Sequence, residues 1–377
     1  MEILSNWRRA VPLGCLVASL LGAGAWATTA GGPFADEAGE RAARASARIE
    51  AALFLAVARA GERLVAVGER GFVQLSDDGG RRWRQAREVP VSVTLTNVQF
   101  VSASVGWAVG HGGVVLHTRD GGERWERQLD GTQAAALILE DAQAAAAGSD
   151  EPALQRAVRE AEGLVADGAD KPLLGLHFQD ERRGWVVGAY GLALATEDGG
   201  QHWRSFVRQI DNRGGKHLYD VRAQGGGLVV AGEQGALFRA EEAGQAGGGH
   251  FAALASPYAG TWFGAVTGPG EALLVFGLRG NAYRREAPGA GWVRVESGLP
   301  VTLTAGARLD DGSIVLADES GRLLRSTDGG GRFAVLPVNE ARSLTGIVQA
   351  ADGGLVLSGA RGMSRLEPEI LAKETRQ

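Results

Sequence analysis

The chain has 377 residues, of which 39 are Lys or Arg and 44 are Asp or Glu, giving a formal net charge of −5. This mild acidic balance argues against nucleic acid as the main partner, because nucleic-acid-binding surfaces are usually basic. Cys15 is the single cysteine, so the chain has no intramolecular disulfide and no cysteine cluster for metal or redox chemistry.

The first 27 residues have the layout of a signal peptide. Trp7-Arg8-Arg9 is basic, and residues 10–25 form an apolar stretch that is too short and glycine-broken for a membrane span. Ala25-Trp26-Ala27 matches the small-x-small cleavage rule, so we predict cleavage after Ala27 and export. A lipoprotein signal would use Cys15, but the apolar run follows this cysteine. The expected location is the periplasm, or the lumen if the host is photosynthetic.

Two repeated landmarks organise the rest of the chain. A turn motif, Ser/Thr-x-Asp-Gly-Gly-x-x-aromatic, lies at 76–83, 118–125, 196–203 and 326–333. About eight residues ahead of each comes a Gly-x-x-Gly, with Asp318 in place of the first glycine in the sixth unit, and this landmark also marks units without the full turn motif. Its second glycine recurs at steps of 42, 78, 44, 45, 41 and 41 residues, at Gly71, Gly113, Gly191, Gly235, Gly280, Gly321 and Gly362. Seven units of about 42 residues remain once an insertion in the long step is removed.

Each unit predicts four short strands. In the second unit these are 94–101, 106–109, 114–118 and 124–128, joined by short links that contain glycine. Four-stranded units of this length are typical of propeller blades, which protect sheet edges by radial closure. We therefore predict an all-β fold, a seven-bladed β-propeller of four-stranded antiparallel blades over residues 51–370, after a lead-in at 28–50 and before a polar tail at 371–377.

The residue types that recur in the four copies of the turn indicate a structural role. The Asp carboxylate can accept backbone N–H groups, the glycines allow positive φ, and the aromatic ring can pack between blades. The alternative for the rings is stacking on a cofactor or a sugar. The structural positions are Asp78, Trp83, Asp120, Trp125, Asp198, Trp203, Asp328 and Phe333.

Residues 131–170 interrupt the repeat between the second and third blades. They are alanine-rich, and 133–147 and 151–165 predict a helical hairpin whose second helix Ser149 or Asp150 could cap. Its apolar side chains must pack on the propeller, on the other helix or on another protein. The insertion is either a recognition element or an ornament of the rim.

The last unit lacks the Asp-Gly-Gly turn and the outer aromatic. A ring closes best when its two ends share a blade. We therefore predict that a segment ahead of Ala51, within the lead-in, supplies the missing outer strand of the seventh blade.

The repeats allow a family resemblance to be stated. Asp-Gly-Gly-x-x-Trp turns preceded by Gly-Trp-x-Val-Gly, as at 106–110 and 184–188, resemble the photosystem II stability and assembly factor family over roughly residues 51–366. The resemblance implies an exported or lumenal propeller that is not an enzyme and binds membrane-protein subunits during assembly. Relatives also occur in bacteria without photosystems, so a role in photosynthesis does not follow from the resemblance alone. We expect a protein partner in a membrane complex, no cofactor, no metal, no membrane span in the mature chain, and a monomer.

The binding residues are expected on one face of the ring. The turns between second and third strands and the connections between blades emerge together there, and the position before each second glycine is Arg in three units. The resemblance implies a similar arginine patch, so the predicted binding residues are Arg70, Arg279, Arg361, Arg87, Arg342 and Tyr190. The alternative is a set of solvated charges that Glu69, Glu319 and Glu340 neutralise.

An Asp-box glycoside hydrolase is the alternative function, because the same turn, also called the BNR repeat, occurs in sialidases. Such an enzyme would need three arginines on a carboxylate and a Tyr activated by a Glu, but Tyr190 has no obvious Glu partner. The six histidines show no ligand spacing for a metal. We therefore predict no catalytic residue.

Overall fold

The computed structural model describes residues 38–241, 249–268, 270–340 and 342–371. The predicted signal peptide, residues 28–37 of the lead-in and residues 372–377 of the tail lie outside the described residues. The described residues belong to one compact unit, Gly31–Gln377.

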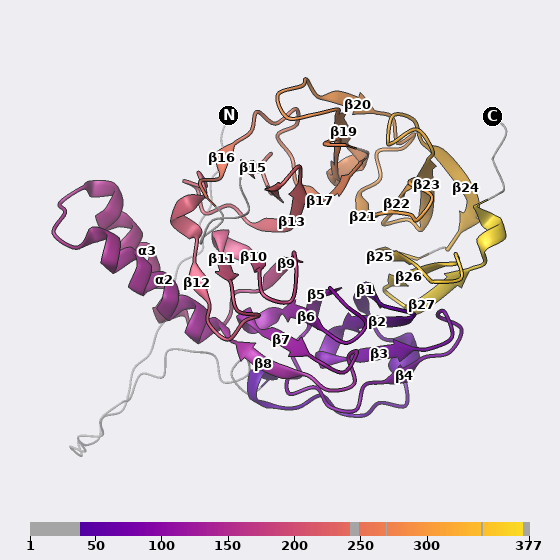
Figure 1. Ribbon diagram of the computed structural model, residues 1–377, viewed down its shortest axis with the longest axis horizontal. Helices are drawn as coiled ribbons and strands as arrows, with labels where there is room; N and C mark the ends of the chain where they lie inside the picture. Colours follow the sequence, from indigo (N-terminus) through magenta and orange to yellow (C-terminus); the bar gives the residue numbers. More distant parts are fainter. Residues whose placement is uncertain (1–37, 242–248, 269, 341, 372–377) are drawn as a thin grey trace, which may run out of the picture. The chain divides into compact units, whose positions relative to one another are not determined.

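The described residues form seven antiparallel sheets arranged around a ring, which confirms the predicted propeller (Figure 1). Six sheets have four strands and the seventh has three, in the order of the chain from the centre outwards. The first three blades comprise β1 (Phe54–Ala60), β2 (Arg63–Gly68), β3 (Val73–Ser76) and β4 (Arg84–Gln85), then β5 (Leu95–Phe100), β6 (Gly106–Gly110), β7 (Val115–Thr118) and β8 (Glu126–Leu129), then β9 (Leu173–Phe178), β10 (Gly184–Gly188), β11 (Ala193–Thr196) and β12 (Arg204–Ser205).

The remaining four blades follow in the same sense around the ring. They comprise β13 (Leu218–Gln224), β14 (Gly227–Gly232), β15 (Leu237–Ala240) and β16 (Ala252–Ala253), then β17 (Trp262–Thr267), β18 (Leu273–Gly277), β19 (Ala282–Arg285) and β20 (Val293–Val295), then β21 (Leu303–Arg308), β22 (Ile314–Asp318), β23 (Arg322–Ser326) and β24 (Ala334–Asn339), then β25 (Leu344–Gln349), β26 (Leu355–Gly359) and β27 (Gly362–Leu366).

Side chains of the inner strands tie each blade to the next. The Thr96 hydroxyl donates a hydrogen bond to the Leu173 carbonyl at 2.6 Å, from the second blade to the third. The Thr345 hydroxyl donates in the same way to the Phe54 carbonyl at 2.6 Å, from the seventh blade to the first. Because the inner strand of each blade has an edge without a strand partner, such bonds satisfy backbone groups at the centre of the ring.

The repeated turn has the predicted geometry. The Thr118 hydroxyl accepts a hydrogen bond from Gly122 N at 3.0 Å and donates to Asp120 Oδ1 at 3.0 Å. Asp120 Oδ1 also accepts from Arg124 N at 2.9 Å, and the Trp125 indole N–H donates to the Gly122 carbonyl at 2.9 Å. The Ser or Thr, Asp and glycine contacts recur in the other three copies. The carboxylate therefore organises the backbone that follows it.

Of the seven tryptophans in the described residues, five belong to the core, as predicted, and Trp83 and Trp292 are partly buried against it. Trp107 and Trp262 are fully buried, and Trp125, Trp185 and Trp203 are at most 7% exposed. Trp107 of the second blade stacks on Phe178 of the third, with ring centroids 3.7 Å apart and an interplanar angle of 5°. The rings thus join neighbouring blades and do not line an open cleft.

The carboxylates of the Asp-box turns should make the stability of the fold depend on pH in acid. Backbone N–H of Arg82 is the main cause that lowers the pKa of Asp78 below its ordinary value of 3.8. A carboxyl whose folded pKa is depressed stabilises the fold above its unfolded pKa, and this contribution is lost as the pH falls through the folded pKa. We expect the urea midpoint to fall as the pH drops below about 4. Asp78→Asn should reduce this dependence, and an unchanged pH profile in that variant would contradict the assignment.

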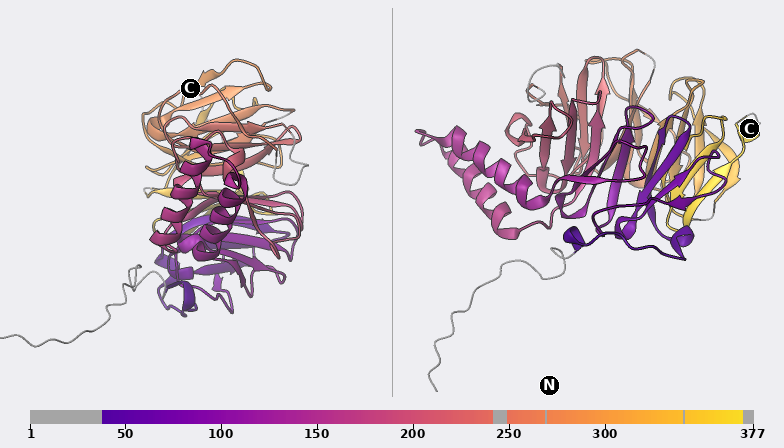
Figure 2. Two further views of the ribbon diagram at one scale, coloured as in Figure 1. Left: turned by 90° about the vertical axis from the view of Figure 1, so that its left-hand side faces the viewer. Right: turned by 60° about the horizontal axis from the view of Figure 1, so that its bottom comes forward.

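The insertion forms the predicted helical hairpin of α2 (Gly131–Ala146) and α3 (Pro152–Asp167). Figure 2 shows that it projects from the rim of the ring. Ile138, Ala142 and Ala161 of the helices share a buried cluster with Leu173 and Trp203 of the third blade. The apolar face therefore packs on its own pair and on the propeller.

The predicted cap of the second helix is wrong. Glu151 is the N-cap residue of α3 and makes no side-chain capping bond, and the Ser149 hydroxyl instead accepts from Glu151 N at 3.2 Å, ahead of the helix. A capping box instead begins α2, where Asp130 Oδ1 accepts from Gln133 N at 3.0 Å and Gln133 Oε1 accepts from Asp130 N at 3.0 Å.

The seventh blade has three strands, and in the described residues the predicted outer strand from the lead-in is absent. Residues 38–50 form no strand beside β27, and residues 28–37 lie outside the described residues. Residues Ile49–Ala51 instead form one 3-10 turn, and Gly362 N donates to the Ala52 carbonyl at 2.9 Å. Ile49 is buried in a cluster with Phe72 and Met363. The lead-in therefore supplies an apolar side chain without a strand, since residues 41–48 contain only Arg, Ala and Ser and have low β-propensity.

Ion pairs also join the last blade to the first. Arg365 on β27 pairs with Asp352 at 2.8 Å and with Glu367 at 3.0 Å. Arg81, in the Asp-box turn of the first blade, pairs with the same two carboxylates at 2.9 and 3.2 Å. We refer to Arg81, Asp352, Arg365 and Glu367 as the closure network.

Candidate protein-binding face

The two faces of the ring carry different turns. In each antiparallel blade, the turn between the second and third strands lies at the opposite end from the Asp-box turn between the third and fourth. We name these ends the turn face and the Asp-box face. The helical hairpin begins at the turn face, where a Cβ on Gly113 would lie 2.6 Å from the Gly131 Cα. The hairpin therefore shares one face with Arg70, Arg279 and Arg361, which lie in turns between second and third strands.

The turn face holds four side chains on strained backbone. Arg70, Tyr190, Gln234 and Arg279 occupy equivalent positions with φ between 51° and 57°. Residues other than glycine rarely adopt this left-handed region, at a cost of about 1 kcal/mol or more each. Strain of this kind often accompanies function, although here it also follows from the repeated turn.

The structure places Arg70, Arg279 and Arg361 at exposed turn tips of the first, fifth and seventh blades. Within the described ranges none of the three guanidinium groups makes an ion pair or a side-chain hydrogen bond. The three glutamates of the alternative have other partners: Glu69 accepts from Leu53 N, Glu319 accepts from Thr302 N, and Glu340 pairs with Arg342. Three free cations thus lie on the turn face.

Two of the predicted binding arginines, Arg87 and Arg342, have other contacts in the structure. Arg87 lies beside the Asp-box turn of the second blade, with its Nε 3.4 Å from Glu123 Oε2. The hydrogen bond from Arg84 is the main cause that holds the pKa of Glu123 below its usual value. Arg342 is only 13% exposed and donates to the Arg361 carbonyl at 2.9 Å. We therefore remove Arg87 from the candidate face and assign Arg342 to support of the Arg361 turn.

Tyr190 is the most exposed aromatic residue of this face. Its ring is 62% exposed, packs edge-on against His217 at 4.8 Å and lies 4.9 Å from the Lys171 ammonium. Burial alone would lower the pKa of Lys171, but hydrogen bonds to Asp170 and Asp167 raise it, so the ammonium stays charged. A fixed and exposed ring is typical of binding hot spots.

A groove separates the helical hairpin from the third blade. Its volume is about 440 Å³, and its floor is apolar, with Ile138, Ala142 and Leu164 from the helices and Leu192 from the blade. The sequence did not predict this groove. The loop at 206–217 forms one wall, and the unusual length of this connection between β12 and β13 was the one available signal.

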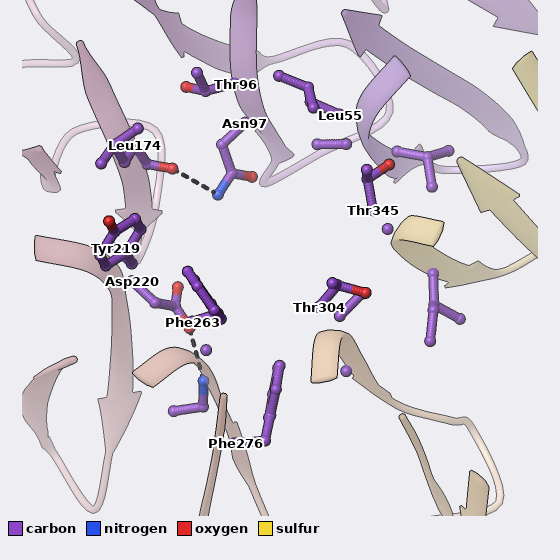
Figure 3. Close-up of a pocket in the computed structure, with 18 of the residues that line it drawn as sticks. Leu55, Thr96, Asn97, Leu174, Tyr219, Asp220, Phe263, Phe276, Thr304 and Thr345 are labelled. Atoms are coloured by element: carbon purple, nitrogen blue, oxygen red, sulfur yellow. Dashed lines mark hydrogen bonds between the residues drawn. The ribbon is translucent and has the colours of Figure 1, made fainter. Parts of the chain in front are cut away.

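A second cavity, of about 520 Å³, occupies the centre of the ring (Figure 3). Every inner strand lines it, and each of the seven has a register irregularity at its second residue. Bulges of this kind redirect side chains. The residues at these positions are Leu55, Thr96, Leu174, Tyr219, Phe263, Thr304 and Thr345.

The described residues contain neither a group of side chains that could hold a metal ion nor a helix that could cross a membrane. In the part of the chain that the structure describes, no three His, Cys, Asp or Glu side chains lie close enough together to hold a metal ion. Among the same residues, no helix has both the length and the apolar character needed to cross a membrane.

Comparisons with known proteins identify the repeats. Residues 54–134 and 160–248, which cover the first three blades and the strands β13 to β15 of the fourth, match the family described as photosynthesis system II assembly factor YCF48. No curated protein matches the chain.

Solved structures agree on the fold. The structure titled YCF48 bound to D1 peptide has a TM-score of 0.60 at 17% identity, and the similarity covers 86% of this chain and 98% of that one. YCF48 from Cyanidioschyzon merolae has a TM-score of 0.60 at 18% identity, and the similarity covers 87% of this chain and 99% of that one. Streptogramin B lyase, an enzyme, has a TM-score of 0.61 at 12% identity, covering 85% and 94%. At these identities the structural likeness shows the fold alone. The chain is a seven-bladed propeller similar to the photosystem II assembly factor family, and the match to the model of that family lies in its first four blades.

Proposed function

We propose that this protein is an exported, non-catalytic scaffold that binds a subunit of a membrane-associated complex through its turn face. The observation that carries the proposal is the group of three exposed arginines without partners, Arg70, Arg279 and Arg361, on the face from which the hairpin projects. Arg binds carboxylates through two parallel hydrogen bonds and is enriched in interface hot spots.

The family match supports a protein partner. One solved relative is described as bound to a D1 peptide, which is a statement about that protein. For this chain, we propose a partner segment with acidic side chains opposite the arginines, and an apolar side chain near Tyr190 or the hairpin groove. The rigid inner strands favour binding with little change in the backbone of the ring.

The hydrolase alternative receives no support from the geometry. A sialidase-like site needs a Tyr beside a Glu, whereas the aromatic and cationic neighbours of Tyr190 are His217 and Lys171. Arg70, Arg279 and Arg361 lie at turn tips of three different blades. We therefore propose binding without catalysis.

Charge reversal on each face tests the proposal. We expect the triple variant Arg70→Glu, Arg279→Glu and Arg361→Glu to weaken capture of a membrane-protein subunit from solubilised host envelope by about tenfold or more. The matched control reverses Arg82, Arg119 and Arg332, three exposed arginines in Asp-box turns. Quantitative mass spectrometry of the captured proteins gives the readout, and the affinity for the identified subunit is then measured with purified proteins.

The control decides between specific contact and net charge. Both triple variants change the charge equally, so equal losses would indicate general electrostatic attraction and contradict the assigned face. Unchanged capture by the turn-face variant would also contradict it. Thermal melting of both variants must match the unaltered protein.

A further inference from the structure

The fourth blade places an unusual pair of charges in the central cavity. Asp220 on β13 is 4% exposed, and its Oδ2 accepts a hydrogen bond from Ala265 N of the next blade at 2.9 Å (Figure 3). Arg222 lies two residues along the strand and also lines the cavity. Its Nε lies 3.0 Å from Asp220 Oδ1 and 3.1 Å from Oδ2.

This arrangement fixes one side of the guanidinium and leaves the other unused. Asp220 holds Arg222 through Nε alone, and within the described ranges the two terminal nitrogens bond no protein group. The side chain of Arg222 is 43% exposed, so solvent and solutes in the cavity reach it. A guanidinium whose Nε is anchored presents its terminal N–H groups as a fork that matches a carboxylate.

The neighbouring wall is aromatic. The Tyr219 and Phe263 rings pack edge to face with centroids 5.2 Å apart, and both lie at the redirected positions of their strands. Burial, followed by the charge of Glu233, raises the pKa of Tyr219, so its hydroxyl remains protonated and able to donate at neutral pH. In the described residues this hydroxyl has no protein partner.

We propose that the central cavity binds an organic carboxylate with an apolar or aromatic body, whose carboxyl group accepts hydrogen bonds from Arg222 and whose body packs on Tyr219 and Phe263. The cavity, of about 520 Å³, is within the usual range for small ligands. This site lies on the inner strands, apart from the turn-tip arginines, and does not depend on the proposed partner.

The charged residues around the cavity indicate whether it favours an anion or a cation. Asp220 and Glu319 are acidic lining residues, and Arg222 is basic. Asp220 is already occupied by Arg222 Nε and Ala265 N, and Glu319 Oε1 lies 3.5 Å from Thr302 N. Glu319 lies in the turn after β22, whereas Arg222 lies on the same strand as Tyr219 and its terminal nitrogens have no protein partner in the described residues. The unused donors on this strand favour an anion over a cation.

Calorimetric titration with three matched probes tests the charge preference. They are 3-phenylpropionate, its neutral amide and the phenethylammonium cation. We expect the acid to bind at least about tenfold more tightly than the amide, since charge-assisted hydrogen bonds are the stronger ones. The cation should bind more weakly still. Equal binding of acid and amide, tighter binding of the cation, or no binding of the acid at 10 mM or below would overturn the proposal.

Variants then locate the site. Arg222→Lys keeps the charge beside Asp220 but removes the fork, so it should lose about tenfold in affinity for the acid while melting near the unaltered protein. Arg308→Gln is the control. Arg308 is an exposed residue at the end of the inner strand β21, and its side chain does not line the cavity, so this variant should bind the acid normally. Unchanged affinity in Arg222→Lys would exclude the fork as the carboxylate site.

The carboxylate could belong to a free acid or to the end of a peptide. A Gly-Gly-Gly-Phe peptide with a free carboxyl end and the same peptide as its amide separate these sources. Binding of the free-ended peptide with the affinity of 3-phenylpropionate would extend the ligand class to chain ends. Binding of the small acid alone would restrict it to free acids, and both results support the proposed chemistry.

Discussion

Replacing Trp107 with alanine is expected to lower the free energy of unfolding by about 3–5 kcal/mol. The side chain is fully buried, stacks on Phe178 of the next blade at 3.7 Å and on His117 at 4.9 Å. Its removal leaves a cavity between two blades that rigid sheets cannot close. Equilibrium unfolding in urea, followed by far-UV circular dichroism, measures the change.

Trp292 provides the matched control. It is only partly buried, although its indole N–H donates to the Ala255 carbonyl at 3.0 Å. Trp292→Ala should therefore cost clearly less than Trp107→Ala. A loss below about 1 kcal/mol for Trp107→Ala would contradict the assignment of the tryptophans to the core.

Arg365→Ala is expected to destabilise the ring by about 2–3 kcal/mol, because it removes charge-assisted hydrogen bonds from a side chain that is 7% exposed. Arg365 links β27 to Asp352 and Glu367, and it also donates to the Gly79 carbonyl of the first blade. The seventh blade lacks a shared strand in the described residues, so this closure network carries a larger part of the closure.

Hydrogen exchange locates the effect of Arg365→Ala. Amides of β25, β26 and β1 should exchange faster in the variant, while those of β13 and β14 should change little. Arg294→Ala is the control, since Arg294 is 62% exposed and its nearest carboxylate, on Glu296, is 3.8 Å away. Uniform acceleration around the ring would contradict a local role in closure.

The repeat made most of the fold predictable from the sequence. The Asp-box turn depends on local hydrogen bonds, such as those of Thr118 and Asp120, which adjacent residues encode almost alone. The hairpin was equally local, because segments rich in alanine and other strong helix formers favour helix. Local interactions therefore account for the confirmed predictions.

The wrong predictions concern contacts between distant segments. The closing of the seventh blade by Ile49 depends on a cluster shared with Phe72 and Met363, which are far away in the sequence. Likewise, Arg87 follows an outer strand as expected, but its guanidinium group pairs with Glu123 of the next blade. Neither partner can be inferred from the spacing of the repeat.

The cavity residues were missed for a different reason. Strand alternation does not reveal that a register irregularity redirects Tyr219 and Phe263. Asp220 and Arg222 also look like ordinary strand charges until Ala265 N of the neighbouring blade fixes the carboxylate. The candidate sites on the turns were predictable because turn tips are exposed by construction.

Site-specific photo-crosslinking tests the proposed turn-face contact most directly. A photo-reactive residue at position 279 of the turn face, or at 332 of the Asp-box face, is introduced into the protein in its own host. If the turn face contacts the partner, position 279 crosslinks to a membrane-protein subunit and position 332 does not. Crosslinking of the same subunit from 332 but not from 279 would contradict this contact.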